Sequence, residues 1–272
     1  MKIAQYREGK TSKLAVVNND LLIPIIFEGN LIDLINSSCP LQLDYSNPVY
    51  INQVKLEPPI KNPQTIIAIG LNYKGHIKES KGKLPSVPII FSKFSSSIIG
   101  NNDYIKWNKE ITKKVDYEAE LAVVIGKKIK DCPEEKAIDV IFGYMCANDI
   151  SARDLQFSDG QWTRGKSLDT FCPIGPWIVT KDELKPDNLT IRCYINGQVM
   201  QESNTQEMIF SVTQLVSFLS KHFTLYPGDI ILTGTPEGVG AFRNPQVWLK
   251  DGDEVAVEID GIGKLINKCK QI

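Results

Sequence analysis

Short apolar runs separated by turn-forming residues dominate the chain, and this pattern favours strands over helices. Residues 2–7, 13–17 and 21–26 form three such runs, with Glu8-Gly9 and an Asn-Asn-Asp sequence at 18–20 between them. Runs of this length with Gly, Asn and Asp between them are typical of a β-meander. We therefore expect a small β-rich region at the start of the chain.

A proline-rich segment ends this first region. The sequence LEPPIKNPQ contains Pro58, Pro59 and Pro63, and proline disfavours both helix interiors and central strands. We interpret the segment as a linker. It predicts a small N-terminal β-rich domain over 1–62 and a larger domain over 63–272.

The larger domain is also rich in predicted strands. Runs of Val, Ile and aromatic residues, bounded by Gly, Asp or Asn, indicate strands in TIIAIG, YEAELAVVIG, AIDVIFGYMCAND, GPWIVT, LTIRCYING, GDIILTGT and DEVAVEIDGIGKLINK. One long helix is predicted over 208–222, where apolar residues recur at helical spacing before Pro227-Gly228. Because strands and helices do not alternate regularly, the predicted class is α+β.

Two glutamates share one face of a predicted strand. The two-residue period over 117–125 places Glu118 and Glu120 on the same side as Ala122 and Val124. A solvated strand face is the common reason for such a pair, because glutamate is usually exposed. Here the surroundings are apolar, and like charges in that setting need a cation or a proton to offset them.

A third carboxylate, Asp149, ends the run FGYMCAND. An aspartate there is often just a turn residue, and Ser151-Ala152-Arg153-Asp154 after it fits a capping box that opens a short helix. Together with the two glutamates, however, it forms a set of three hard oxygen donors without histidine or cysteine. Such a set suits Mg²⁺, Mn²⁺ or Ca²⁺ better than zinc.

The chain has two histidines. His76 lies in GLNYKGHIKES with Glu79 three residues later, which is the same face if the segment is helical. A carboxylate beside an imidazole orients it and raises its basicity, as a general base requires. An exposed histidine that happens to lie near a glutamate is the alternative. His222 is interpreted as a cation at the end of the predicted helix.

One motif match points to another function. The sequence GQWTRGKS over 160–167 fits the P-loop expression letter for letter. A P-loop follows a strand and opens a helix whose N-terminus binds phosphate, whereas here FSD precedes the match and Pro173 and Pro176 follow it closely. We therefore predict that the match is accidental.

Composition narrows the choice of partner. The chain of 272 residues has 31 Lys and Arg against 32 Asp and Glu, so it does not create the positive field that nucleic acid or an anionic membrane requires. No run approaches the ~18 apolar residues of a membrane span, and the six cysteines include no C-x-x-C pair. We expect a cytoplasmic protein with a small-molecule partner.

Seven ordered motifs resemble those of the fumarylacetoacetate hydrolase family, in its shorter bacterial and archaeal form. They are GLNYKGHIKES, IIFSKFSSSIIG, VDYEAELAVVIGK, GYMCANDISARDLQ, QWTRGKSLDTFCPIGP, LYPGDIILTGTPEGVG and VEIDGIGKLINK. Phe94 replaces the usual proline after the lysine of F-x-K, and Asn101-Asn102 replaces a usual glycine-rich turn. Both departures put substrate specificity in doubt more than the chemistry.

The resemblance implies a rolled, mixed β-sheet and specific roles for residues. It implies a metal, Mg²⁺ or Mn²⁺ with Ca²⁺ as a further option, on Glu118, Glu120 and Asp149. It also implies that His76 and Glu79 activate water and that Lys166 lies near the metal. By the same match, the substrate-contacting positions are Arg153, Gln156, Thr170 and Thr235. A homodimer is expected on this basis alone.

The resulting hypothesis is a metal-dependent hydrolase that cleaves the C–C bond of a small β-diketo acid of the acylpyruvate type. In it, a metal-chelated 2-oxo acid is attacked by water at its 4-carbonyl. One alternative is an oxaloacetate-type decarboxylase, or a hydratase or isomerase of a 2-hydroxymuconate-type acid, because one scaffold hosts several such reactions. A metal- or ligand-binding module without catalysis is another, although mere binding requires no base.

Overall fold

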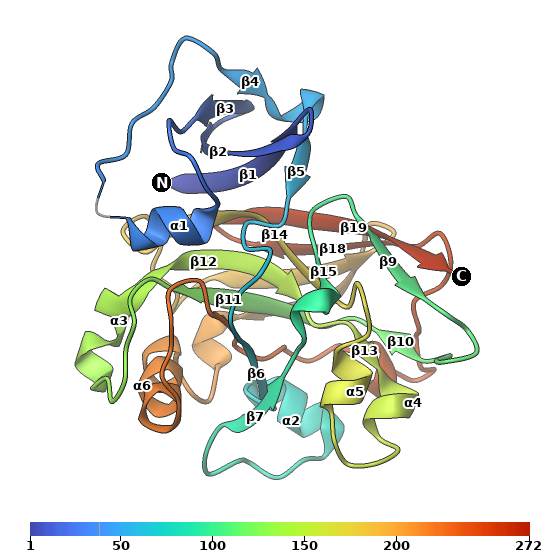
Figure 1. Ribbon diagram of the computed structural model, residues 1–272. Coiled ribbons are helices and arrows are strands. Elements are labelled where there is room, and N and C mark those ends of the chain that lie inside the picture. Colours follow the sequence, from blue (N-terminus) through green and yellow to red (C-terminus); the bar gives the residue numbers. More distant parts are fainter. Residues whose placement is uncertain (38) are drawn as a thin grey trace.

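The computed structural model describes residues 1–37 and 39–272 and confirms the predicted α+β class. Strands in three sheets are the main regular structure of the chain, and short helices lie mainly at one end of the molecule (Figure 1). The main helices are α1 (Leu31–Asn36), α2 (Lys74–Ser80), α3 (Ala137–Val140), α4 (Arg153–Gln156), α5 (Thr163–Lys166) and α6 (Val212–His222). Short 3₁₀ turns occur at Ile51–Gln53, Ser95–Ser97, Glu134–Lys136, Thr205–Glu207 and Gly240–Phe242.

A twelve-stranded mixed sheet is the centre of the fold. Its main path runs β4-β3-β2-β1-β14-β12-β11-β17-β6-β7, with β5 paired to β1 and β8 to β14. These strands are β1 (Lys2–Glu8), β2 (Thr11–Asn18), β3 (Leu21–Pro24), β4 (Val49–Tyr50), β5 (Lys55–Glu57), β6 (Ile66–Gly70), β7 (Ile89–Ser92), β8 (Ile98–Ile99), β11 (Ala119–Ile125), β12 (Ile141–Asn148), β14 (Cys172–Thr180) and β17 (Ile230–Leu232).

Two smaller sheets complete the structure. The five-stranded sheet has the order β16-β15-β18-β19-β9, and β10 pairs with β13 as a separate ribbon. Their strands are β9 (Tyr104–Trp107), β10 (Val115–Asp116), β13 (Ser151–Ala152), β15 (Thr190–Ile195), β16 (Gln198–Asn204), β18 (Glu254–Ile259) and β19 (Gly263–Gln271).

Strand β11 has two different apolar faces, as the two-residue period predicts. Ala122 and Val124 pack in a cluster with the strands of the N-terminal region. Leu121 and Val123 pack in the larger cluster, which includes the five-stranded sheet. Both faces are therefore buried, so the carboxylates at the start of this strand lie inside the molecule.

The N-terminal strands join the central sheet directly. Strand β1 pairs with β14 in antiparallel register, with Lys2 opposite Val179 and Ile3 opposite Ile178. The three runs predicted as a meander are β1, β2 and β3, which form consecutive antiparallel pairs. The domain boundary between 62 and 63 stays a prediction. Within the described residues, no helix is long and apolar enough to cross a membrane.

Three local predictions from the sequence were wrong. The long helix starts at Val212 and not at 208, because the Ser211 side chain caps it by accepting the N–H of Gln214. The start of the run AIDVIFGYMCAND is the helical turn α3. The predicted capping box at 151–154 does not form, since Ser151 belongs to strand β13, the N-cap of α4 is Ala152, and no side chain caps the helix.

Candidate metal centre and active site

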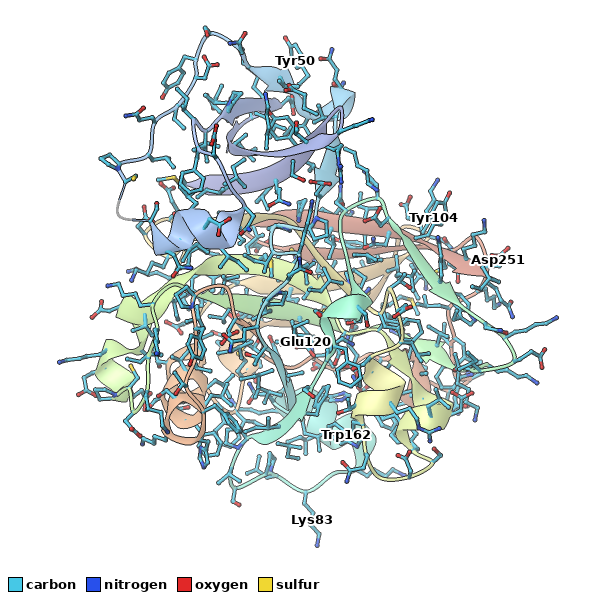
Figure 2. All side chains as sticks on the ribbon, in the orientation of Figure 1. Tyr50, Lys83, Tyr104, Glu120, Trp162 and Asp251 are labelled. Atoms are coloured by element: carbon cyan, nitrogen blue, oxygen red, sulfur yellow. The ribbon has the colours of Figure 1, made fainter. Side chains whose placement is uncertain are left out.

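Three buried carboxylates converge at the start of β11. Glu118, Glu120 and Asp149 each offer an oxygen within 4.8 Å of the others, and all three side chains are nearly inaccessible to solvent. Figure 2 places Glu120 deep in the molecule, among the strands of the central sheet. The structure therefore brings together the residues that the sequence proposed as metal ligands.

The sheet topology explains why these residues meet. Strands β12 and β17 both run antiparallel to β11, and β6 runs parallel to β17. The carboxyl ends of β6, β12 and β17 therefore lie beside the start of β11. Asp149 follows β12 directly, and its N–H donates to the carbonyl of Glu118 at 2.9 Å.

A glycine turn after β17 holds Glu120. The N–H of Gly234 donates to Oε2 of Glu120 at 2.7 Å. Gly234 has a φ of +97°, and a Cβ there would lie 2.7 Å from the Cβ of Asn72. Only glycine fits this left-handed conformation and close approach without strain, so the turn is built to aim a backbone donor at the carboxylate.

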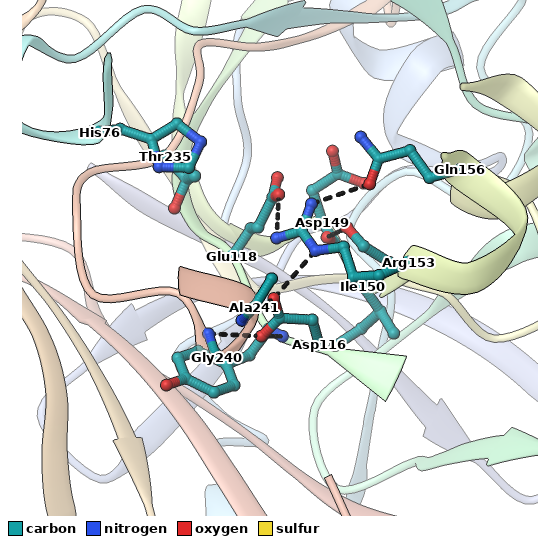
Figure 3. Close-up of polar contacts among 12 residues, drawn as sticks. His76, Asp116, Glu118, Asp149, Ile150, Arg153, Gln156, Thr235, Gly240 and Ala241 are labelled. Atoms are coloured by element: carbon teal, nitrogen blue, oxygen red, sulfur yellow. Dashed lines mark hydrogen bonds and ion pairs between the residues drawn. The ribbon is translucent and has the colours of Figure 1, made fainter. Parts of the chain in front are cut away.

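Three cations surround the carboxylates. Lys166 Nζ lies 2.6 Å from Glu118 and 2.8 Å from Asp149. Lys93 Nζ contacts the other oxygen of Asp149 and the backbone carbonyl of Lys166. Arg153 pairs with Glu118 at 2.7 Å and with Asp116 at 2.9 Å (Figure 3). The cluster thus has three cations and four carboxyl groups, which are those of Asp116, Glu118, Glu120 and Asp149. One carboxyl group is therefore in excess.

The excess falls on Glu120. Burial, together with the like charges of Asp149 and Glu118, raises the pKa of Glu120 well above its usual range. Burial alone would also raise the pKa of Glu118, but the charges of Lys166 and Arg153 outweigh it and hold that pKa below its usual range. The group as a whole therefore favours one additional positive charge.

A divalent metal fits this site. The donors are carboxylate oxygens without histidine or cysteine, which suits Mg²⁺, Mn²⁺ or Ca²⁺. The excess negative charge gives a physical reason for binding. Glu118 and Asp149 are also held by lysines, so an ion here would share its ligands with ammonium groups.

His76 and Glu79 form the predicted pair on helix α2. Nδ1 of His76 lies 2.7 Å from Oε1 of Glu79, and the other oxygen of Glu79 accepts the N–H of Gly238 at 2.8 Å. The backbone of Gly238 therefore holds the Glu79 carboxylate, and the carboxylate in turn orients the His76 ring. With Nδ1 directed at the carboxylate, Nε2 is the ring nitrogen that remains for the cavity.

Asn72 fixes the entry into this helix. Its side-chain amide donates to the carbonyls of Phe210 and Thr233, and its oxygen accepts the N–H of Phe210. The amide therefore ties the turn after β6 to the turn after β17. His76, on the short helix that follows, is buried.

A cavity of about 330 Å³ is lined both by residues of the charged cluster and by His76. His76, Glu118 and Lys166 all line it, and so do three of the predicted substrate-contacting residues: Arg153, Gln156 and Thr235. Figure 3 shows His76 and Thr235 on one side of Glu118, with Arg153 and Gln156 on the other.

Thr170 lies elsewhere. Its hydroxyl accepts the N–H of Lys106 at 2.8 Å and donates to the carbonyl of the same residue, and it is not among the residues that line the cavity. The structure gives Thr170 a backbone-binding position, so the role that the resemblance implied for it stays a prediction.

The segment that matches the P-loop expression serves this site instead. It runs from the loop after α4 through the short helix α5, and no helix follows Lys166 before strand β14 in the described residues. The Lys166 ammonium is bound to Glu118 and Asp149, so it is already paired with carboxylates and is not a free phosphate-binding lysine. The context that a P-loop requires is therefore missing, as the sequence predicted.

We accordingly expect no specific binding of ATP or GTP. Genuine P-loop proteins bind nucleotide through backbone amides and a free lysine, and both are missing here. Isothermal titration calorimetry with either nucleotide at up to ~1 mM should give no saturable heat. A dissociation constant near micromolar would contradict this reading of the segment.

Sequence reasoning missed two residues of the charged cluster. Lys93 is buried against Asp149, and buried Asp116 holds Arg153 while accepting the N–H groups of Gly240 and Ala241. Lys93 stands in IIFSKFSS, and Asp116 follows the sequence Lys113-Lys114-Val115. A lysine between apolar runs was the available signal for Lys93, whereas no local pattern singled out Asp116.

Comparison with known proteins places the chain in a family. The family model described as "Fumarylacetoacetate (FAA) hydrolase C-terminal" matches residues 65–270. The chain therefore belongs to the fumarylacetoacetate hydrolase family. Among curated relatives, mitochondrial oxaloacetate tautomerase of Rattus norvegicus is 50% identical over 219 residues, which are 80% of this chain and 70% of that protein.

Solved structures agree over the whole chain. Fumarylacetoacetate hydrolase from Exiguobacterium antarcticum has a TM-score of 0.92 at 36% identity, and all of each chain is covered. The 5-carboxymethyl-2-hydroxymuconate delta-isomerase from Mycobacterium smegmatis has a TM-score of 0.86, also at 36% identity and with both chains fully covered. The family is thus established, and the relatives named here are enzymes that differ in reaction.

Proposed function

We propose that this protein is a divalent-metal-dependent enzyme that interconverts the keto and enol forms of a small 2-oxo acid of the oxaloacetate type. The observation that supports this most directly is the cavity, which is lined both by His76 and by Glu118 and Lys166 of the charged cluster. The name of the Rattus norvegicus relative at 50% identity supports the choice of tautomerisation among the family's reactions. The homodimer expected from the resemblance stays a prediction.

The charged cluster would bind the acid end of the substrate. Glu118, Glu120 and Asp149 would hold a divalent ion, which would supply Lewis-acid chemistry at the acid end of the substrate. The ammonium of Lys166 would face the same end of the substrate and donate a hydrogen bond to the 2-oxo oxygen. Arg153 and Gln156 would fix the orientation of the substrate from the side.

His76 would move the proton. In the keto-to-enol direction, Nε2 takes a proton from carbon 3, and the electron pair of that C–H bond passes to the 2-oxo oxygen. Lys166 stays charged, because Asp149 and Glu118 raise its pKa in spite of the opposing effect of burial. It therefore stabilises the developing negative charge without losing its own proton. The proton held by Nε2 then passes through a water molecule to the enolate oxygen, which gives the enol and leaves His76 neutral again.

Hydrolytic C–C cleavage is the second candidate, and the His76–Glu79 pair favours it. A histidine held by a carboxylate that is itself held by Gly238 is suited to deprotonate water. Attack on the 4-carbonyl of an acylpyruvate would release the same pyruvate enolate that Lys166 stabilises. Both reactions thus use the same groups, and they differ in whether water or carbon 3 gives up the proton.

Substrate turnover separates the two reactions. Enol oxaloacetate absorbs in the ultraviolet, so catalysed ketonisation with Mg²⁺ or Mn²⁺ should appear as a faster loss of that absorbance. Acylpyruvate cleavage would be followed as release of pyruvate in a parallel assay. Brisk acylpyruvate cleavage without acceleration of ketonisation would transfer the assignment to the hydrolase, and loss of CO₂ from oxaloacetate as the dominant reaction would transfer it to a decarboxylase.

A further inference from the structure

Two cavities share one wall. The site cavity of about 330 Å³ lies next to a groove of about 950 Å³ that runs along β6 and β7. Phe91 and Trp162 are the two residues that line both spaces. Figure 2 shows Trp162 below Glu120, near β7 and α2. Their aromatic rings therefore separate the reaction site from a much larger space.

The position of Trp162 is closely determined. Its ring lies against Gly70, where an added Cβ would come within 2.3 Å of the indole, and it meets Phe91 edge-on with the ring centroids 5.3 Å apart. Trp162 precedes Lys166 by one helical turn, and its carbonyl accepts the N–H of Lys166 at 3.0 Å. The same short segment therefore presents the lysine and the indole to the cavity.

The loop before Trp162 is also held in place. Arg164 pairs with Asp159 at 2.6 Å and donates to the hydroxyl of Ser158. The N–H of Gln161 donates to Asp159 as well. The loop is exposed, yet these contacts limit the positions that the indole ring can adopt.

The two aromatic residues differ in their role. The Phe91 ring lies 5.3 Å from the Lys166 ammonium, so this ring also contacts a charged group of the site. Trp162 contacts Phe91 and the backbone at Gly70, and neither of these contacts involves a charged group. Removal of the indole therefore opens the wall with the least disturbance of the charged cluster.

Beyond the wall the groove is mainly apolar. Its lining includes Ile66, Ile67, Ile89, Phe223 and Leu225. The one lysine there, Lys93, is already bound to Asp149. A substrate tail that entered the groove would be stabilised by burial of hydrocarbon and not by an ion pair.

We propose that Trp162 sets the upper length of the substrate, so that the native site accepts short 2-oxo acids and excludes those with extended acyl chains. The inference rests on the proposed function for the identity of the acid end. Among the described lining residues, Trp162 and Phe91 are the ones that the site cavity and the groove share, so the indole stands between the two spaces. A smaller residue at 162 opens this path to uncharged tails.

Binding of straight-chain 2-oxo acids tests the wall. We would measure dissociation constants of pyruvate, 2-oxobutanoate, 2-oxohexanoate and 2-oxooctanoate by calorimetry in the presence of Mg²⁺. The native protein should bind the two short acids best. Trp162→Ala should retain them and gain affinity for the long acids, by about fourfold for each methylene that enters the groove. Trp162→Leu, which keeps more of the packing, should show a smaller gain in the same direction.

Two further variants make the test specific. Trp248→Ala also removes a partly buried indole but lies outside both cavities, so its chain-length profile should match that of the native protein. Gly70→Ala places a methyl group where the indole lies. It should disturb the native profile, and in the Trp162→Ala background it should shorten the opened path. The two substitutions would then be non-additive.

The outcomes distinguish this proposal from the proposed function. Identical chain-length profiles for native protein and a folded Trp162→Ala variant would overturn the role of Trp162. So would native protein that binds 2-oxooctanoate as well as pyruvate. If the acids bind with the expected profile but no oxo acid is turned over, the wall is supported and the proposed reaction fails. Native protein that binds none of the acids would overturn both.

Discussion

Replacing Glu120 is expected to abolish binding of Mg²⁺ and metal-dependent activity while the fold survives. Glu120 is the carboxyl group in excess over the surrounding cations, and burial and repulsion raise its pKa. In the metal-free protein its charge is unfavourable, so Glu120→Gln removes a ligand without loss of packing volume. We expect this variant to unfold at a temperature no lower than that of the metal-free native protein, and Glu120→Ala to unfold slightly lower.

Thermal unfolding and calorimetry measure this together. A ligand at a hundredfold excess over its dissociation constant stabilises a protein by about 2.7 kcal/mol, which corresponds to several degrees in Tm for a chain of this size. The native protein should show this shift with Mg²⁺, and both Glu120 variants should lose it.

Glu110→Ala provides the matched control, because Glu110 is an exposed carboxylate on a turn. It should keep the Mg²⁺-induced shift in full. Calorimetry that finds unchanged Mg²⁺ binding in a folded Glu120→Ala variant would remove Glu120 from the proposed site.

Replacing His76 with alanine is expected to reduce turnover by about 10²- to 10⁴-fold, the usual contribution of a positioned general base. Metal binding should be unaffected, since His76 is not among the three carboxylate ligands. Glu79→Gln should reduce the rate less, because it weakens the orientation and basicity of the imidazole but leaves the imidazole in place. The loss should appear in kcat more than in KM.

The second histidine supplies the control. His222 lies at the end of α6, where Nδ1 contacts the carbonyl of Phe218, and His222→Ala should retain native turnover. Decarboxylation of oxaloacetate requires chiefly an electron sink, so any such side reaction should fall much less in His76→Ala than ketonisation does. Native turnover in the His76 variant would exclude this residue as the base.

Much of the site could be predicted because its residues lie in strongly patterned elements. The two-residue period over 117–125 predicted that Glu118 and Glu120 share a face. The helical spacing of His76 and Glu79 predicted that these two side chains meet. The period holds because both faces of β11 are buried, so every position along it is constrained. The ordered motifs then identified the family, which the match over 65–270 confirms.

The remainder depends on contacts that are distant in the sequence. Lys93 and Asp149 are 56 positions apart, and Arg153 and Asp116 are 37 positions apart, so no local spacing indicates either pair. Ser151 is not the cap because it lies in strand β13 and α4 begins one residue later than the capping box requires, with Ala152 at the N-cap. The start of α6 was misplaced because apolar residues before Ser211 continue the helical spacing although the backbone there is not helical.

The pairing of β1 with β14 has a consequence for any attempt to isolate a minimal catalytic unit. A protein cut between 62 and 63 would lack β1 and leave the Ile178–Val179 segment of β14 as an open edge. It would also uncover apolar side chains that now pack against Ile3 and Leu14. Unpaired, apolar strand edges recruit other chains, so the truncated protein should aggregate at concentrations where the full chain stays dispersed, even with every proposed catalytic residue present.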